Sequence, residues 1–247
     1  MFYGATPARA AIRRCTEICR LLRGDPWAEA LARQPLAALH AMQSNFDEAY
    51  VLLDAAATTL AEFGPTVDAA ASHSEAYAAI LAGDLDRADR QLRTGRRVLI
   101  EMGERAVLAS VEGYLGLVAL AQGRPAEAER KARQCRRLAS ADDVSPQVLW
   151  RQVHARVLAS RNSPRKARIL AEEAAELAAT TDQLNIRADA LVDLAIVCKE
   201  GADPAGSTRA VEAAIDLYRE KENIAGIELA RQLVAGEGPA LLVRPSV

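Results

Sequence analysis

The chain of 247 residues is half hydrophobic, contains 4% aromatic residues and has a formal net charge of -2. This length is enough for a substantial core, and the near-neutral charge gives no overall attraction to nucleic acid or anionic lipid. Valine, isoleucine and threonine do not gather in short alternating runs, so the composition favours helices over strands.

In chain order, a helix is expected first over residues 7–22, where Thr6 can cap the first turn and Pro7 suits the first helical position. Two helices joined by a breaker-rich turn then occur five times. The first helices of these hairpins are predicted at residues 27–43, 67–82, 104–122, 145–160 and 183–200, and the second helices at 47–63, 84–102, 126–139, 164–180 and 205–220. A last helix near 224–234 would cover the exposed end of the array. Residues 1–236 thus form one predicted repeat domain, and residues 237–247 are predicted to be a disordered tail.

The turns inside the hairpins recur every 39 or 40 residues. They begin at Ser44, Gly83, Gly123, Asn162 and Gly201, and a second series of breaks separates one hairpin from the next. A fixed period of this length is typical of stacked repeat proteins. An irregular helical bundle is the alternative, but such a bundle has no reason to keep one spacing.

Small residues identify the type of repeat, because two helices that cross closely need glycine or alanine where their backbones approach. In the third unit, Leu115, Gly116, Ala119, Gly123 and Ala128 stand at the offsets of a tetratricopeptide repeat. The predicted fold is therefore all-α, a right-handed α-α superhelix of about five tetratricopeptide-like hairpins with flanking helices.

Five segments also carry a resemblance to a known family: residues 46–49, 101–105, 142–151, 156–159 and 187–195. They resemble the tetratricopeptide region at the C-terminus of large bacterial signalling proteins that contain a class III nucleotidyl cyclase domain and an AAA-type ATPase domain. The present sequence has no GxxxxGK[ST] phosphate loop and no paired metal-binding aspartates in a strand context. The resemblance therefore implies a sensing or docking module, either expressed alone or cut from a longer protein.

The concave surface of such an array is the expected binding site, because the first helices of the hairpins line a groove that accepts a peptide or a helix. The repeat offsets place six candidate groove residues there: Gln34, His73, Tyr77, Leu117, Gln152 and Arg156. Tyr77, Gln152 and Arg156 are the preferred candidates, since rigid aromatic residues and arginine supply much of the energy of protein interfaces. Each of these residues can instead be a solvated or packed side chain.

A second candidate surface consists of arginines on the outer helices, which we call the basic ladder. Its members are Arg90, Arg93 and Arg97 on one hairpin and Arg130, Arg133 and Arg137 at positions 40 residues later on the next. The ladder could meet an acidic partner or phosphate groups, or it could be a solvated face with ion pairs between repeats. Aromatic residues for base stacking are missing from it, which disfavours nucleic acid.

Catalytic or metal-binding motifs are not found in the sequence. His40, His73 and His154 lie far apart, and Cys15 and Cys19 provide two thiols on one helical face, whereas a metal site needs three or four ligands. His40 and His154 fall at helix-packing offsets. We therefore expect no cofactor, no metal and no catalytic residue.

Sequence features also bear on the compartment. No apolar run approaches the roughly 20 residues that cross a bilayer, and the first residues lack the charged-then-apolar order of a signal peptide. The four cysteines are too few and too scattered for a disulfide framework, and only four of the 31 basic residues are lysines. A cytoplasmic protein from a GC-rich bacterial genome is expected.

The resulting hypothesis is a non-catalytic adaptor or regulatory scaffold that binds a segment of a partner protein in its groove. The alternative is an enzyme or small-molecule sensor whose groove has closed into a pocket, with His73, Tyr77 and Arg156 as polar contacts. A third possibility is self-association through an end hairpin.

Overall fold

The computed structural model describes residues 4–63 and 65–235, without the side chains of residues 65–73 and 233–235. All regular secondary structure within these residues is helical. The helices are α1 (Ala8–Leu21), α2 (Pro26–Met42), α3 (Phe46–Ala61), α4 (Pro65–Ala82), α5 (Leu85–Met102), α6 (Arg105–Ala121), α7 (Pro125–Leu138), α8 (Val144–Ser160), α9 (Pro164–Ala179), α10 (Leu184–Glu200), α11 (Pro204–Lys221) and α12 (Ile224–Ala235). The predicted fold class is confirmed, while the predicted tail at 237–247 lies outside the described residues.

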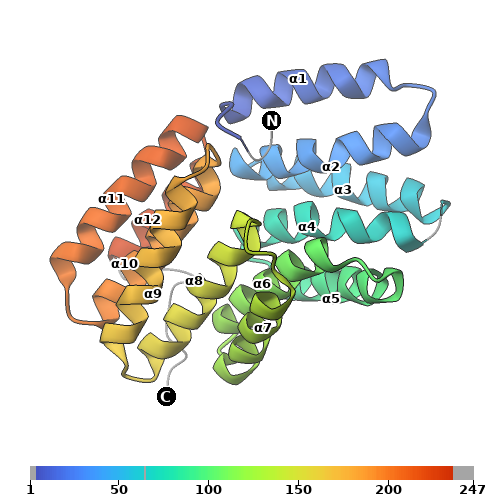
Figure 1. Ribbon diagram of the computed structural model, residues 1–247. Coiled ribbons are helices and arrows are strands. Elements are labelled where there is room, and N and C mark those ends of the chain that lie inside the picture. Colours follow the sequence, from blue (N-terminus) through green and yellow to red (C-terminus); the bar gives the residue numbers. More distant parts are fainter. Residues whose placement is uncertain (1–3, 64, 236–247) are drawn as a thin grey trace.

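Five helical hairpins follow one another in space (Figure 1). They are α2/α3, α4/α5, α6/α7, α8/α9 and α10/α11, and α1 and α12 flank the array. The first helix of a hairpin contacts the first helix of the next, as in the pairs α2/α4, α6/α8 and α8/α10. The first helices therefore form the inner side of a superhelix.

Each turn inside a hairpin contains one residue in the left-handed conformation. These residues are Ser44 (φ 60°), Gly83 (φ 76°), Gly123 (φ 70°), Asn162 (φ 57°) and Ala202 (φ 59°). The sequence predicted that the fifth turn begins at Gly201; in the structure Gly201 has a φ of -82°, and the next residue, Ala202, is the left-handed one. The turn geometry is thus repeated, although the glycine is one residue out of step.

Replacing Ala202 with glycine should stabilise the protein by up to about 1 kcal/mol, because a left-handed alanine is strained and glycine is not. The reverse change, Gly83→Ala, should destabilise it by a similar amount. A Cβ atom on Gly83 would meet nothing within 4 Å, so the cost comes from the backbone alone. Urea denaturation of both variants measures the effects, and a destabilised Ala202→Gly variant would contradict the interpretation.

Close contact between neighbouring first helices depends on small residues. A Cβ atom on Gly113 of α6 would lie 2.7 Å from the Cβ atom of Leu149 of α8. A Cβ atom on Gly116, one turn later, would lie 3.0 Å from both methyl groups of Val153. Larger side chains at these positions would push α6 and α8 apart, so glycine sets the spacing of the inner helices.

The two ends of the superhelix are in contact through the end of α11. Lys221 is fully buried, and its Nζ atom donates hydrogen bonds to the carbonyl oxygens of Gly4 (2.7 Å) and Thr6 (2.8 Å). The expectation that Thr6 caps α1 is wrong, because Pro7 occupies the N-cap position without a side-chain cap. The carbonyl oxygen of Thr6 instead accepts a hydrogen bond from Lys221, near the other end of the described chain.

A second set of closing contacts surrounds the start of α12. Asn223 is fully buried, and its Nδ2 atom donates to Asn185 Oδ1 of α10 (3.0 Å) and to Tyr77 Oη of α4 (3.3 Å). Asn185 Nδ2 in turn lies 3.6 Å from Met42 Sδ of α2. Ala225 of α12 belongs to the same hydrophobic cluster as residues of α1, α2, α3 and α4. The array therefore closes on itself instead of remaining an open superhelix.

Candidate functional site

A cavity lies on the inner side of the superhelix. Side chains of α4, α6, α8 and α10 line it, together with Tyr218 of α11 and Leu229 of α12. It encloses about 850 Å³ including the open solvent at its mouth, and the centres of water molecules can occupy about 100 Å³ of it. Its walls are mostly apolar. A concave, apolar space with a few polar groups is the usual form of a ligand site.

Four of the six predicted groove residues line this cavity: Tyr77, Leu117, Gln152 and Arg156. Gln34 is buried in α2 but is not among the lining residues. His73 belongs to α4, and its side chain lies outside the described residues. A binding role for each of the six remains a prediction.

The polar groups of the cavity come together on one side. Arg156 Nη1 of α8 lies 3.3 Å from Asp193 Oδ1 of α10, and both side chains are buried. One helical turn earlier, Asp189 Oδ1 accepts a hydrogen bond of 2.5 Å from the hydroxyl group of Tyr218. The two carboxylates thus bind different partners although they share one face of α10.

The proton affinity of Asp189 departs strongly from that of a free aspartate. Burial raises the pKa of its carboxyl to about 7, the hydrogen bond from Tyr218 opposes that rise, and the nearby charge of Asp193 adds to it. Burial also raises the pKa of Asp193, against the effect of Arg156. Asp189 is half-buried and lines the cavity, so it can exchange protons with whatever occupies that space.

Gln152 lies in the same wall, with a side chain that is 2% exposed. Its amide is near enough to Asp193 to lower the pKa of that carboxyl. Its Nε2 atom nevertheless makes no hydrogen bond of normal geometry with any described residue. A buried donor without an acceptor is costly, which makes Gln152 a candidate contact for a bound molecule.

The sequence interpretation missed Asp189, Asp193 and Tyr218. The repeat offset of 39 residues leads from Gln152 to Leu191, whereas the structure places Asp189, 37 residues after Gln152, in the cavity wall. Two positions on a helix differ by about 200° in direction. Two carboxylates four residues apart in an apolar helix are a signal that could have directed attention to α10.

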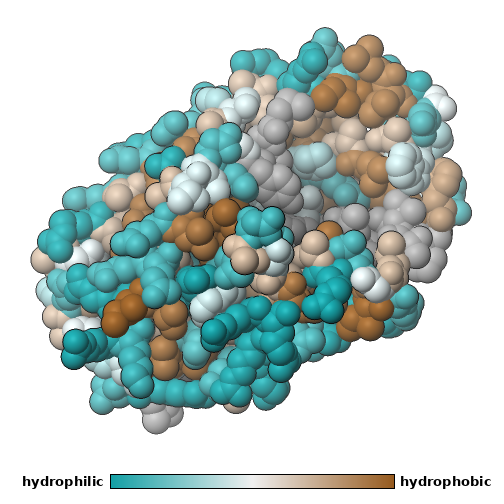
Figure 2. Space-filling view, viewed as in Figure 1, coloured by the Kyte–Doolittle hydropathy of each residue, from teal (hydrophilic) through white to brown (hydrophobic). Residues whose placement is uncertain are grey.

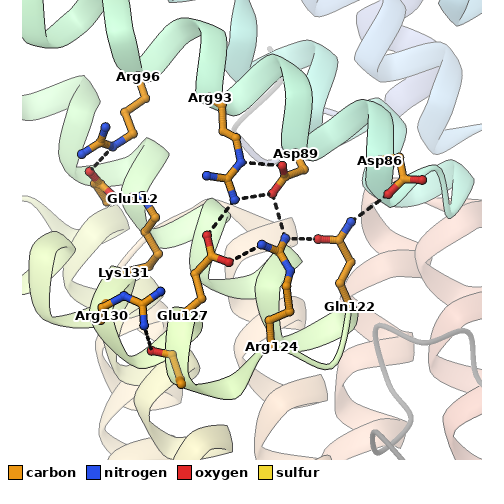
Figure 3. Close-up of polar contacts among 11 residues, drawn as sticks. Asp86, Asp89, Arg93, Arg96, Glu112, Gln122, Arg124, Glu127, Arg130 and Lys131 are labelled. Atoms are coloured by element: carbon orange, nitrogen blue, oxygen red, sulfur yellow. Dashed lines mark hydrogen bonds and ion pairs between the residues drawn. The ribbon is translucent and has the colours of Figure 1, made fainter.

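Part of the basic ladder is paired with acids, as Figure 3 shows for Arg93. Arg93 binds Asp89 on its own helix at 2.5 Å and Glu127 of the next hairpin at 2.7 Å. Arg124 binds the same two acids. Burial alone would raise the pKa of Asp89 and of Glu127, but hydrogen bonds and charges from the two arginines lower both. This part of the ladder therefore joins two repeats.

Other members of the ladder differ in their surroundings. Arg133 binds Glu129, Arg130 donates to the carbonyl oxygen of Ala126, and Arg137 donates to Gln134. All six ladder arginines are exposed. Binding of an acidic partner by this surface remains a prediction.

Glu112 of α6 stands beside the ladder but is fully buried (Figure 3). Its carboxylate binds Arg96 Nε of α5 at 2.7 Å and Lys131 Nζ of α7 at 2.8 Å. Two cations from two hairpins therefore meet one acid between them. If the hairpins shifted relative to each other, the buried carboxylate of Glu112 would lose its cationic partners, which is costly. The group therefore favours one alignment of the two hairpins.

The remaining polar chemistry is sparse in the described part of the chain. His40 and His154 are partly buried, and burial lowers the pKa of both. No group of three or more histidine, cysteine, aspartate or glutamate side chains among the described residues could hold a metal ion.

None of the helices, as far as they are described, has the length and apolar character needed to span a membrane. The face in Figure 2 is mostly polar, with apolar residues in separate groups.

No protein-family model and no curated protein matches this chain. Three solved structures are similar in fold. The structure of BtubC (BKLC) from P. vanneervenii has a TM-score of 0.60 and 16% identity, over 87% of this chain and 92% of that one. NprR in complex with its cognate peptide NprX has a TM-score of 0.69 and 14% identity, over 94% of this chain and 68% of that one.

The third structure is the apo form of the quorum sensor NprR from B. thuringiensis, with a TM-score of 0.60 and 14% identity. The match covers 91% of this chain and 65% of that one, so the chain spans slightly less than two thirds of its length. Identities this low show the fold alone. The chain is a tetratricopeptide-like helical repeat protein.

Proposed function

We propose that this chain is a non-catalytic regulatory module that binds a segment of a partner protein, or a peptide, in the cavity on its inner side. The observation that carries the proposal is the cavity itself, an apolar space lined by four consecutive first helices and containing a buried polar cluster. Apolar walls supply binding energy, and the few fixed polar groups orient the ligand.

The architecture supports a preorganised site. Tyr77 contributes to the cavity wall and also accepts a closing hydrogen bond from Asn223, so the wall is held by the contact between the two ends of the array. A rigid site pays little ordering entropy on binding. One similar structure is that of NprR with a peptide, which supports a peptide as the class of ligand to test first.

We also propose that the module acts in signalling, as the resemblance to the repeat region of the cyclase and ATPase proteins implies. The cytoplasmic location, the bacterial origin and self-association through an end hairpin stay predictions.

A small-molecule sensor or an enzyme is the second candidate, and one observation favours it. The ends of the array touch, and Asp189, with its pKa raised to about 7 by burial, lies in the enclosed space. A carboxyl with such a pKa can exchange protons near neutral pH. Saturable binding of small metabolites, with no binding of peptides, would support this candidate over the first.

Leu117→Trp should test the proposed site, because Leu117 is half-buried and its enlarged side chain would fill the cavity. We expect this variant to lose peptide affinity by about tenfold or more while it stays folded. Val51→Trp is the matched control, since Val51 is 64% exposed on α3. Titration calorimetry measures affinity and circular dichroism measures folding. Equal affinity of the two variants would argue against binding in the cavity.

A further inference from the structure

The charges around the cavity do not balance. Its charged lining residues, within the described part of the chain, are Arg156, Asp189 and Asp193. Arg156 is paired with Asp193 at 3.3 Å. When Asp189 ionises, its nearest partner is the neutral hydroxyl group of Tyr218. Among the described residues, the lining therefore contains one carboxylate more than it has cations, in a place where burial makes a lone negative charge costly.

Within the described residues, one oxygen of the Asp189 carboxylate accepts no hydrogen bond. Tyr218 donates to Asp189 Oδ1, and no described residue donates a hydrogen bond to Asp189 Oδ2. Three buried or half-buried groups of the same wall, Gln152, Asp189 and Asp193, lie within one polar cluster. A cationic donor on a bound molecule would satisfy Asp189 and balance the charge.

A buried amide donor, Gln152 Nε2, lies in the same wall as this carboxylate. Gln152 Nε2 is buried, lines the cavity and makes no hydrogen bond of normal geometry among the described residues. Its natural partner is a carbonyl oxygen. The remaining wall is apolar, with Ile80, Leu81 and Leu149 among its members. The complementary molecule thus has a cation, a carbonyl group close to it and an apolar body.

We infer that the cavity captures the free amino-terminal residue of a peptide, with its ammonium group on Asp189, its first carbonyl oxygen on Gln152 and an apolar side chain against the wall. This inference rests on the proposed function and specifies the end of the ligand that is read. The amino-terminal residue is the part of a peptide in which an ammonium group and a carbonyl group are separated by a single carbon atom.

A lysine side chain fits less well, because its ammonium group stands four methylene groups away from the backbone and has no adjacent carbonyl. The size of the cavity also favours a chain end. The centres of water molecules can occupy about 100 Å³, and Leu229 of α12 forms part of the wall at the closed end of the array. One residue suits this space better than a segment that passes through it.

The test uses the purified chain and two pools of hexapeptide amides with all positions randomised, one with free amino ends and one N-acetylated. Affinity selection with mass spectrometry identifies the retained peptides, and calorimetry measures their dissociation constants. We expect retained peptides to come from the free pool, to begin with apolar residues and to lose about tenfold or more in affinity on acetylation.

Asp189→Asn should lower the affinity for peptides with a free amino end by a similar factor and leave the affinity for acetylated peptides unchanged. Asp216→Asn is the matched control, because Asp216 is exposed on α11 and is not among the residues that line the cavity.

The possible failures are distinguishable. Equal retention from both pools that Leu117→Trp abolishes would overturn the amino-terminal assignment and leave the proposed function standing. Retention of acetylated peptides that depends on an internal lysine would overturn the assignment in the same way. Absence of retention from either pool, or retention that Leu117→Trp leaves intact, would overturn the proposed function, and the assignment would fall with it.

Discussion

Replacing Asn223 with alanine is expected to lower the free energy of unfolding by about 3 kcal/mol. Asn223 directly precedes α12, and its Oδ1 atom accepts a hydrogen bond of 2.9 Å from the amide of Gly226. Loss of such a cap typically costs about 1 kcal/mol. Its Nδ2 atom also binds Asn185 and Tyr77, and leaving these buried partners without a donor should cost about 2 kcal/mol more.

Two further variants separate the cap from the closing contacts. Asn223→Ser retains an oxygen for the cap but is too short to reach α10 and α4, so it should recover about 1 kcal/mol of the loss. Asp84→Ala removes an ordinary cap, in which Asp84 accepts from the amide of Arg87 at 3.0 Å, and should cost about 1 kcal/mol.

Chemical denaturation followed by circular dichroism compares the three variants. Amide hydrogen exchange adds a local readout, because loss of the closing contacts should speed exchange in α12 and α1 more than in the central hairpins. If Asn223→Ala and Asp84→Ala were equally stable, the hydrogen bonds from Asn223 to Asn185 and Tyr77 would contribute nothing beyond the cap.

Replacing Asp189 with asparagine is expected to stabilise the unliganded protein by about 2 kcal/mol at pH 8 and to have little effect near pH 4. Asparagine keeps an acceptor for the hydroxyl group of Tyr218 but carries no charge. The variant therefore removes the cost of ionising a carboxyl in the cavity wall and preserves the contact that holds α10 to α11.

The direction of this change in stability with pH follows from the number of protons that the folded and unfolded states bind. Burial raises the pKa of Asp189 in the folded protein from 3.8 to about 7, so the folded state binds more protons than the unfolded state between these values. The stabilising effect of the bound proton is complete below about pH 4 and is lost as the pH rises through about 7. A tenfold difference in proton affinity corresponds to about 1.4 kcal/mol, and water in the cavity screens part of the total.

The experiment measures unfolding of the wild type and of Asp189→Asn at several pH values and takes the difference between them. Burial lowers the pKa of His40 and of His154, and any contribution from these two groups is common to both proteins and cancels in the difference. Asp216→Asn serves again as the exposed control and should give no trend. A difference that stayed constant with pH would show that Asp189 has an ordinary pKa.

Much of the local structure follows from the sequence. Each predicted helix corresponds to an observed one with similar ends, because prolines such as Pro125, Pro164 and Pro204 suit helix starts and the turns contain residues that tolerate a left-handed backbone. The fixed period then predicts the stacking. It also placed Tyr77 and Arg156 on the inner side, since equivalent positions of neighbouring repeats share one face.

The tertiary structure alone decided how the array ends and which side chains meet in its interior. Lys221 binds the backbone of Thr6, which is 215 positions away in the sequence, and no local sequence pattern predicts that contact. Asp189 lines the cavity although it stands two positions before Leu191, the residue that the repeat offset from Gln152 indicates. Helix formation and turn geometry depend on a few neighbouring residues, so they can be predicted locally. Small rotations between hairpins accumulate along the whole stack, and their sum determines both the closure of the superhelix and the composition of its cavity.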